Sequence, residues 1–250
     1  MPAVFLNGNP ESGAIWDLLR AELAREDVVS LSPPGFGAPI PDGFGCTMPD
    51  YRDWLIAELA ELGEPVDLVG HDLGGAFTAV VAMARPDLLR TWASDALGVF
   101  DPDYVWHHLA QQWQTPGVGE DSVAELLGGT LEERTEAMAA RVTDRPVAAR
   151  LAAAQGPETS RAILTFYRSA VQPFMADLGQ GLSAAAARPG LALVATDDHL
   201  GGPQDMHRRS ATRAGAQVAP LDGAGHWWMV QDPVRSARVL TSFWAEQADS

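Results

Sequence analysis

An aspartate between glycines occupies a position that suits a nucleophile. Asp72 occurs in the run GHDLGG, which follows the apolar segment Val66 to Val69. A residue on a strained turn between a strand and a helix needs small neighbours two positions away on either side, and Gly70 and Gly74 meet that need. The Asp72 carboxylate would then lie exposed at the N-terminus of the following helix. An ordinary turn with an aspartate N-cap is the alternative interpretation.

A carboxylate nucleophile limits the kind of carbon that can be attacked productively. Attack on an acyl carbon would give only an anhydride, whereas attack on the sp3 carbon of an epoxide or alkyl halide gives an ester that water can cleave. The residue type at Asp72 therefore favours alkyl electrophiles as substrates. It argues against ester hydrolysis, which would call for a serine at this position.

A histidine near the end of the chain is the predicted general base. His226 lies in GAGHWW, a glycine-rich stretch directly after the apolar segment Gln217 to Leu221. A neutral imidazole placed there can take a proton from the water molecule that cleaves the ester on Asp72. The alternative interpretation is a surface histidine with no chemical role.

The elements that must position these groups are short strands alternating with helices. Apolar segments predict strands at residues 3–6, 28–31, 66–69, 91–94, 191–195 and 217–221. Helical spacing of apolar residues covers 13–26, 49–62, 74–84, 203–214 and 233–247. Such an alternation indicates right-handed crossovers and an α/β fold with a mainly parallel sheet flanked by helices.

The alternation is interrupted once, in the middle of the chain. From about Gly98 to Arg188 the sequence shows no convincing strand, only helical stretches rich in Ala, Glu, Arg and Gln. This block predicts an inserted helical cap over residues 98–188. Residues 1–97 together with 189–250 would form the core domain.

Composition and charge exclude several classes of function. The chain of 250 residues is long enough for one sizeable core, and its net charge of −16 argues against nucleic acid or an anionic membrane as a partner. It contains no lysine, which excludes a phosphate-binding P-loop and pyridoxal Schiff bases, and its glycine pairs complete no dinucleotide fingerprint. We therefore expect no cofactor. The adjacent His107 and His108 lack the spacing of metal ligands, so we expect no metal either.

Other features bear on the compartment and the partners. No run approaches the length of a membrane span, and the N-terminus lacks both a basic region and a cleavage-like site, so the cytoplasm is expected. The single cysteine, Cys46, excludes an internal disulfide framework. The expected partner is a small apolar substrate, and the sequence leaves the oligomeric state open, a homodimer included.

These motifs together resemble the α/β-hydrolase fold, in the branch that uses an aspartate nucleophile: epoxide hydrolases, haloalkane dehalogenases and fluoroacetate dehalogenases. The resemblance spans essentially the whole chain and rests on NGNP at 7–10, PPGFG at 33–37, the turn at Asp72, the cap insertion, and GAGHW at 223–227. The family normally has two antiparallel strands before its first motif. We therefore expect a sheet that is truncated at its N-terminal edge.

The resemblance implies further residues around the nucleophile. An acid should orient the ring of His226, and the family places it after either of two strands: Asp198 matches epoxide hydrolases, and Asp95 matches fluoroacetate and some haloalkane dehalogenases. We favour Asp198 of the two. The backbone amides of Asn9 and Leu73 should form the oxyanion hole. The family's usual histidine two positions before Asn9 is replaced here by asparagine.

In the cap, the resemblance implies hydrogen-bond donors for a leaving group. Tyr167, in TFYRSA, resembles the cap tyrosine of epoxide hydrolases, which hydrogen-bonds and protonates the epoxide oxygen, and His107 matches a histidine that replaces a second tyrosine in one subfamily. The alternative is that both residues only pack within the cap. Tryptophans that would line a flat apolar pocket are Trp106, Trp113 and Trp227.

The combined prediction is an epoxide hydrolase that opens an apolar, aromatic epoxide to a vicinal diol through an ester on Asp72. Haloalkane dehalogenation is the second prediction, because Asn9 matches a residue that helps to bind halide. Leu73, however, stands where haloalkane dehalogenases carry a tryptophan and fluoroacetate dehalogenases an arginine. A ligand-binding protein without turnover on the same scaffold is the third interpretation.

Overall fold

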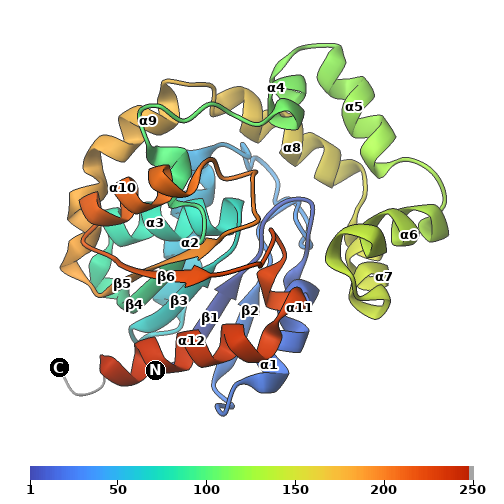
Figure 1. The fold of residues 1–250 in the computed structure, drawn as a ribbon. Coiled ribbons are helices and arrows are strands. Elements are labelled where there is room, and N and C mark those ends of the chain that lie inside the picture. The colour runs from blue at the N-terminus through green and yellow to red at the C-terminus, as the bar shows by residue number, and fades with distance from the viewer. Residues whose placement is uncertain (248–250) are drawn as a thin grey trace.

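Short apolar segments form one parallel sheet in the computed structural model, which describes residues 1–247 (Figure 1). Within those residues the strands are β1 (Ala3–Leu6), β2 (Val28–Leu31), β3 (Val66–Gly70), β4 (Leu89–Ser94), β5 (Gly190–Ala195) and β6 (Gln217–Leu221). Their order is β2-β1-β3-β4-β5-β6, and every neighbouring pair is parallel. The predicted strands and their parallel arrangement are confirmed, with β2 as the edge strand beside β1.

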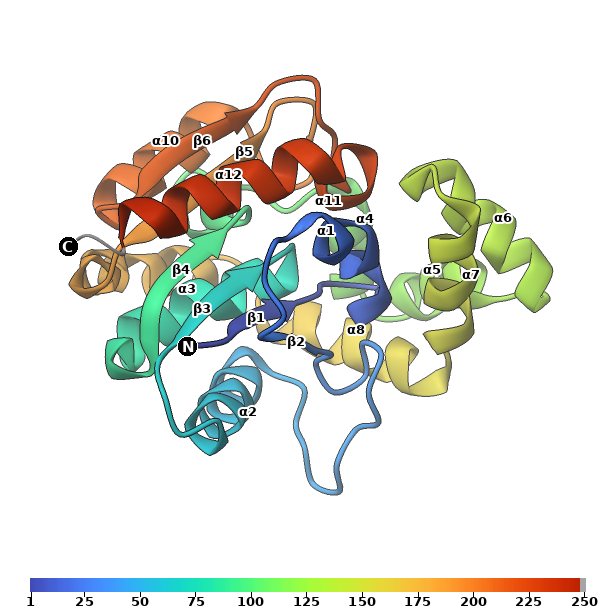
Figure 2. The same cartoon turned by 90° about the horizontal axis from the view of Figure 1, so that it is seen from below.

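Helices cover both faces of the sheet, because successive side chains of each strand point to opposite faces. Val4 and Leu6 of β1 belong to one apolar cluster, and Ala3 and Phe5 belong to the other. The first cluster contains residues of α2 (Met48–Glu61), α3 (Leu73–Ala84) and α10 (Gln204–Arg213), and the second contains residues of α1 (Asp17–Glu22), α11 (Trp228–Gln231) and α12 (Pro233–Glu246). Figure 2 is seen from the side that α1 and α12 cover.

The first helix is shorter than the sequence predicts. In place of one helix over residues 13–26, a 3-10 turn, η1 (Gly13–Trp16), leads into α1, which ends at Glu22. Leu23 follows in an extended conformation, at φ −80° and ψ 129°, and its side chain is buried in the core. Packing of this side chain outweighs the local helical preference of the segment.

The residues between β4 and β5 contain helices and no strand, as predicted. The elements are η3 (Leu97–Phe100), α4 (His108–Gln114), α5 (Val118–Leu127), α6 (Leu131–Val142), α7 (Arg145–Ala154), α8 (Pro157–Ser169), α9 (Phe174–Leu178) and η4 (Gly179–Ala187). Helices α4, α5 and α8 contact one another, whereas α6 and α7 form a separate pair at the side of the molecule (Figure 1). The segment η4 packs along α3 of the core. No helix among residues 1–247 is both long and apolar enough to span a membrane.

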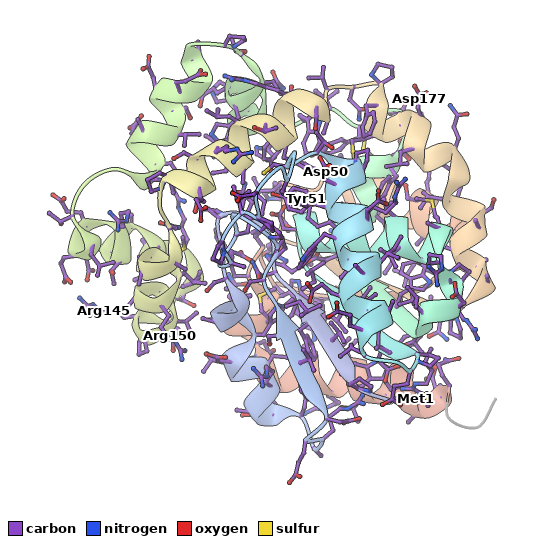
Figure 3. The ribbon with its side chains drawn as sticks, turned by 180° about the vertical axis from the view of Figure 1, so that it is seen from behind. Met1, Asp50, Tyr51, Arg145, Arg150 and Asp177 are labelled. Atoms are coloured by element: carbon purple, nitrogen blue, oxygen red, sulfur yellow. The ribbon has the colours of Figure 1, made fainter. Side chains whose placement is uncertain are left out.

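One tyrosine fixes the PPGFG segment to the core. Tyr51, near the amino end of α2 (Figure 3), stacks on Phe77 of α3 with ring centroids 4.6 Å apart. Its hydroxyl donates to the carbonyl oxygen of Pro34 at 2.8 Å. Burial raises the pKa of Tyr51 far above its usual value, so the hydroxyl keeps its proton and remains a donor. The segment is thereby held beside the loop that follows β1, where the Asn7 side chain donates to the carbonyl oxygen of Phe36 at 3.1 Å.

Candidate active site

Asp72 lies on the strained turn between β3 and α3 that the glycine spacing predicts. Its backbone adopts φ 52° and ψ −123°, a region that costs energy for a residue with a side chain. A Cβ atom on Gly74 would lie 2.5 Å from the carbonyl oxygen of Leu6, so glycine is needed for α3 to start this close to β1. The Asp72 side chain caps no amide of α3, unlike the side chain of an ordinary N-cap aspartate.

The backbone N–H of Asn9 holds one carboxylate oxygen of Asp72. It donates to Oδ2 at 2.9 Å. Leu73 is the first residue of α3, and its N–H is one of the amides that a helix start leaves without an intrahelical partner. Burial raises the pKa of the Asp72 carboxyl, and the neighbouring His226 and His71 oppose this rise.

His226 and Asp198 form a hydrogen-bonded pair beside Asp72. His226 Nδ1 and Asp198 Oδ2 are 2.9 Å apart, and the two residues follow β6 and β5, at the same edge of the sheet as Asp72. Because Nδ1 of His226 is hydrogen-bonded to the Asp198 carboxylate, Nε2 is the nitrogen that is available to accept a proton. Burial disfavours charge on Asp198, but the hydrogen bond and the charge of His226 outweigh it and hold the pKa of Asp198 well below its usual range.

Asp95, the alternative partner for His226, makes its hydrogen bonds elsewhere. Its Oδ2 lies 2.5 Å from His71 Nδ1 and accepts from the indole N–H of Trp228 at 2.6 Å, while Oδ1 accepts from the backbone N–H of Asp72 at 2.9 Å. The physical reason is competition, because these donors lie beneath the turn and engage both carboxylate oxygens. In this structure the histidine is paired with Asp198, and Asp95 supports the turn.

Glu11 and His71 belong to this network and are not among the residues that the sequence predicts. Glu11 Oε1 accepts from the indole N–H of Trp227 at 2.7 Å and lies 3.2 Å from His71 Nε2, while Oε2 accepts from the backbone N–H of Gly8 at 3.2 Å. Both side chains are buried. Their positions carried a signal, since Glu11 directly follows NGNP and His71 directly precedes the nucleophile, and a charge in such a buried setting needs a partner.

The same residues raise the question of a metal. Glu11, His71 and His226 offer ligand atoms that all lie within 4.8 Å of one another. Both ring nitrogens of His71 already face carboxylate oxygens, and Glu11 is shared among three N–H groups. Hydrogen bonding therefore accounts for the grouping, and its members fit metal ligation poorly. That the protein needs neither metal nor cofactor stays a prediction.

Two side chains from the helical segment between β4 and β5 present hydrogen-bond donors near Asp72. Tyr167, on α8, accepts from the side-chain amide of Asn9 at 3.4 Å, which leaves its own O–H free to donate elsewhere. His107 precedes α4, and its Nδ1 accepts from the backbone N–H of Ala110 at 3.2 Å, so the ring proton lies on Nε2. Burial lowers the pKa of His107 to about 4, which keeps the ring neutral at neutral pH. Burial also raises the pKa of Tyr167 well above its usual value, so its hydroxyl stays protonated.

Two adjoining hollows, one smaller than the other, contain these groups. The lining residues that both hollows share are Asp72, His107, Leu200 and His226. Of the predicted tryptophans, Trp106 lines the smaller hollow, and Trp113 and Trp227 line the larger one. The indole N–H groups of Trp106 and Trp227 donate to Ala170 and Glu11, whereas that of Trp113 has no partner among residues 1–247. The rings thus form apolar walls around Asp72, His226 and several hydrogen-bond donors.

A parallel sheet with a strained turn at Asp72 after β3, an acid after β5, a histidine after β6 and helices between β4 and β5 defines a known class of protein. The chain belongs to the alpha/beta hydrolase family, whose model matches residues 3–239. The fold class expected from the motifs is thereby confirmed, and the branch within the family is a separate question.

The relatives of this chain differ in the reactions for which they are named. The chain is 28% identical over 245 residues to polyketide synthase ThaQ of Burkholderia thailandensis, an alignment that covers 89% of this chain and 11% of the synthase. Haloalkane dehalogenase DbeA from Bradyrhizobium elkani matches with a TM-score of 0.70 and 25% identity, over 98% of this chain and 91% of that one. An E-2-(acetamidomethylene)succinate hydrolase matches with a TM-score of 0.78 and 17% identity, over 98% and 91%, which shows the fold alone.

Proposed function

We propose that this protein opens an apolar, aromatic epoxide to a vicinal diol through an ester on Asp72. The observation that carries the proposal is the pair of donors, Tyr167 and His107, which lines the same hollow as Asp72 and His226. An epoxide oxygen develops negative charge as its bond to carbon breaks and needs such donors, whereas a halide ion needs only weak ones. Membership of the family supports hydrolysis in general, and the choice of leaving group rests on the cap.

The first step is attack by Asp72 on one epoxide carbon. The carboxylate oxygen that Asn9 does not hold forms the new C–O bond, and the C–O bond of the epoxide breaks. The freed oxygen takes the hydroxyl proton of Tyr167, with His107 Nε2–H as a second hydrogen-bond donor. The result is a hydroxyalkyl ester on the protein.

Water then cleaves this ester. His226 Nε2 takes one proton as the water oxygen bonds to the carboxyl carbon of Asp72, and Asp198 stabilises the imidazolium that forms. The negative charge that develops on Oδ2 is met by the backbone N–H groups of Asn9 and Leu73. Collapse releases the diol and restores the carboxylate. One proton of the water reaches the diol through the histidine, and the other restores the cap hydroxyl.

Haloalkane dehalogenation is the second candidate. The match to haloalkane dehalogenase DbeA over nearly the whole chain supports it. So does the indole N–H of Trp113, which lines the larger hollow without a partner among the described residues and is the kind of weak donor that suits a halide. Against it, the residue after the nucleophile is Leu73, whose side chain donates no hydrogen bond.

Intact-mass spectrometry of His226→Gln separates the two reactions. Without the base, the ester on Asp72 should accumulate during exposure to an aromatic epoxide or, separately, to a bromoalkane. We expect a mass gain equal to the whole epoxide, because ring opening retains every atom. A gain of the alkyl group alone, with bromide released, would identify a dehalogenase. The added substitution Asp72→Asn should remove either adduct, and no adduct from broad panels of both substrates would overturn both proposals.

Tyr167→Phe should slow ester formation from an epoxide selectively. Loss of a general acid costs about 10²–10⁴-fold in rate, whereas bromide leaves without a proton, so the rate with a bromoalkane should change little. Phenylalanine keeps the ring that packs on Trp113, with centroids 4.7 Å apart. The measurement is the rate of adduct growth in the His226→Gln background. Equal losses with both electrophiles would leave Tyr167 with a packing role only.

A further inference from the structure

The ring of His71 is enclosed between two carboxylates directly beneath the nucleophile. His71 precedes Asp72 in the chain, and its side chain is completely buried. Nδ1 lies 2.5 Å from Asp95 Oδ2, and Nε2 lies 3.2 Å from Glu11 Oε1. The ring also faces that of His226, with centroids 4.6 Å apart. No step of the proposed reaction uses this side chain directly, although it contacts the groups that surround both steps.

The other partners of the two carboxylates fix the charge of this ring. All are N–H donors: the indoles of Trp227 and Trp228 and the backbone amides of Gly8 and Asp72. A carboxylate that accepts several such bonds stays ionised. A neutral imidazole would turn a lone pair toward one of these carboxylate oxygens, which is repulsive. Both nitrogens of His71 must therefore carry hydrogen.

We propose that His71 is a positioning residue, held as a permanent imidazolium by Glu11 and Asp95, and that its fixed charge keeps His226 unprotonated and Asp72 ionised at neutral pH. The first half stands on geometry, and the second rests on the proposed function. A proton on His226 would place two buried cations 4.6 Å apart, which Coulomb repulsion disfavours. The same cation attracts the nucleophile's negative charge.

Several other charges act on the base, and most of them oppose His71. The negative groups around it are Asp72, Asp198, Glu11 and Asp95, and the cap contributes the neutral His107. Burial and His71 lower the pKa of His226, but the pair with Asp198 and the charge of Asp72 outweigh them, so the net shift is upward. His71 therefore limits the rise in the pKa of His226. Burial disfavours charge on His71 itself, yet its two carboxylates raise its pKa well above the usual value.

Nuclear magnetic resonance of the ring nitrogens tests the first half without any substrate. In uniformly ¹⁵N-labelled protein, long-range ¹H–¹⁵N spectra distinguish a doubly protonated ring from either neutral form, and the signals missing from His71→Gln identify those of His71. We expect the doubly protonated pattern from about pH 5 to about pH 9. A ring with one unprotonated nitrogen, or one that titrates within this range, would overturn the proposal.

Variants of opposite charge change test the second half. The acid limb of the activity profile should move up by about one pH unit in His71→Gln, which loses the cation, and down in Glu11→Gln, which loses an anion while Asp95 still holds the ring proton. His108→Gln changes an exposed histidine on α4 and should leave the pH profile of activity unchanged. If the two substitutions only disturbed the structure, activity would fall, but the acid limb would not move in opposite directions. Limbs that stay in place or move in the same direction would overturn the proposal.

The histidine spectra and the adduct measurement on His226→Gln together distinguish a failure of this inference from a failure of the proposed function. The same spectra follow the ring of His226, so the shifts in its protonation can be measured when no substrate is turned over. A doubly protonated His71 with no adduct on His226→Gln would reject the reaction and keep the imidazolium. Adduct formation with a neutral His71 would do the reverse. If His71→Gln does not fold, as circular dichroism would show, the signals of His71 can be assigned by substituting the other five histidines one at a time, and the wild-type spectra and Glu11→Gln still test the proposal.

Discussion

Asp72→Asn is expected to lower turnover by at least about 10⁴-fold and, at the same time, to raise the melting temperature. The amide cannot form the ester on which the second step depends. Stability moves the other way because burial raises the pKa of the Asp72 carboxyl. The folded protein therefore disfavours the ionised form, and this penalty grows as the pH rises from the ordinary carboxyl pKa through the higher folded value, after which it is constant. Asparagine removes the penalty and keeps the shape and the acceptor for Asn9.

Differential scanning calorimetry over a pH series checks the stability half of this expectation. The gain in melting temperature should be full at neutral pH and should shrink in acid, where the wild-type carboxyl becomes protonated and neutral as well. Asp197→Asn, at an exposed neighbour of the site, is the matched control and should change neither property. A melting temperature that falls in Asp72→Asn would contradict the expectation. Intact mass shows whether the asparagine persists, since the activated water could hydrolyse it back.

Asp198→Asn should lower the rate of ester hydrolysis by about 10³–10⁴-fold, because the amide would favour the wrong tautomer of His226 and could not stabilise its cation. Attack by Asp72 does not use this pair, so the ester should accumulate as it does without the base. Asp95→Asn should instead act mainly on stability, at a cost of about 3–5 kcal/mol, since it breaks a buried charge pair with His71.

Two measurements on the same pair of variants check this division of roles. Single-turnover mass spectrometry gives the rates of ester formation and hydrolysis separately, and denaturant unfolding gives the free energy of unfolding. The alternative in which Asp95 orients the base predicts the opposite pattern: normal hydrolysis in Asp198→Asn, and slow hydrolysis with unchanged stability in Asp95→Asn. Slow hydrolysis in both folded variants would mean that the two carboxylates act as one unit.

The sequence is sufficient to predict the sheet and the turn at Asp72 because both follow from local constraints. Short, mostly apolar segments alternate with helical ones, and all six strands were predicted, with β4 starting at Leu89 rather than at residue 91. The turn needs small residues two positions before and after Asp72. Gly70 and Gly74 occupy these positions, so the sequence shows directly that the requirement is met. The predicted helix over residues 13–26 failed at Leu23, where burial in the tertiary structure decides.

The acid that pairs with His226 and the buried network around His71 depend on tertiary contacts, which the sequence alone does not reveal. Asp95 and Asp198 each follow a strand of the same sheet, so position alone cannot separate them. The two acids differ in the donors that surround them: Trp228 and His71 surround Asp95, whereas His226 contacts Asp198. Glu11 shows the same limit, because its partners come from three segments far apart in the chain.

Asn9 contacts both Asp72 and the inserted helices: its backbone N–H donates to the Asp72 carboxylate, and its side chain donates to the hydroxyl of Tyr167 on α8 at 3.4 Å. In the proposed reaction, attack depends on the core and departure of the leaving group depends on the insertion, and Asn9 is one of the residues that contact both. An insertion grafted from a relative would bring its own donors to an unchanged Asp72. In such a chimera the grafted insertion would determine which leaving group is accepted. Exchange of one contiguous segment would then change the reaction while the strained turn at Asp72 stays the same.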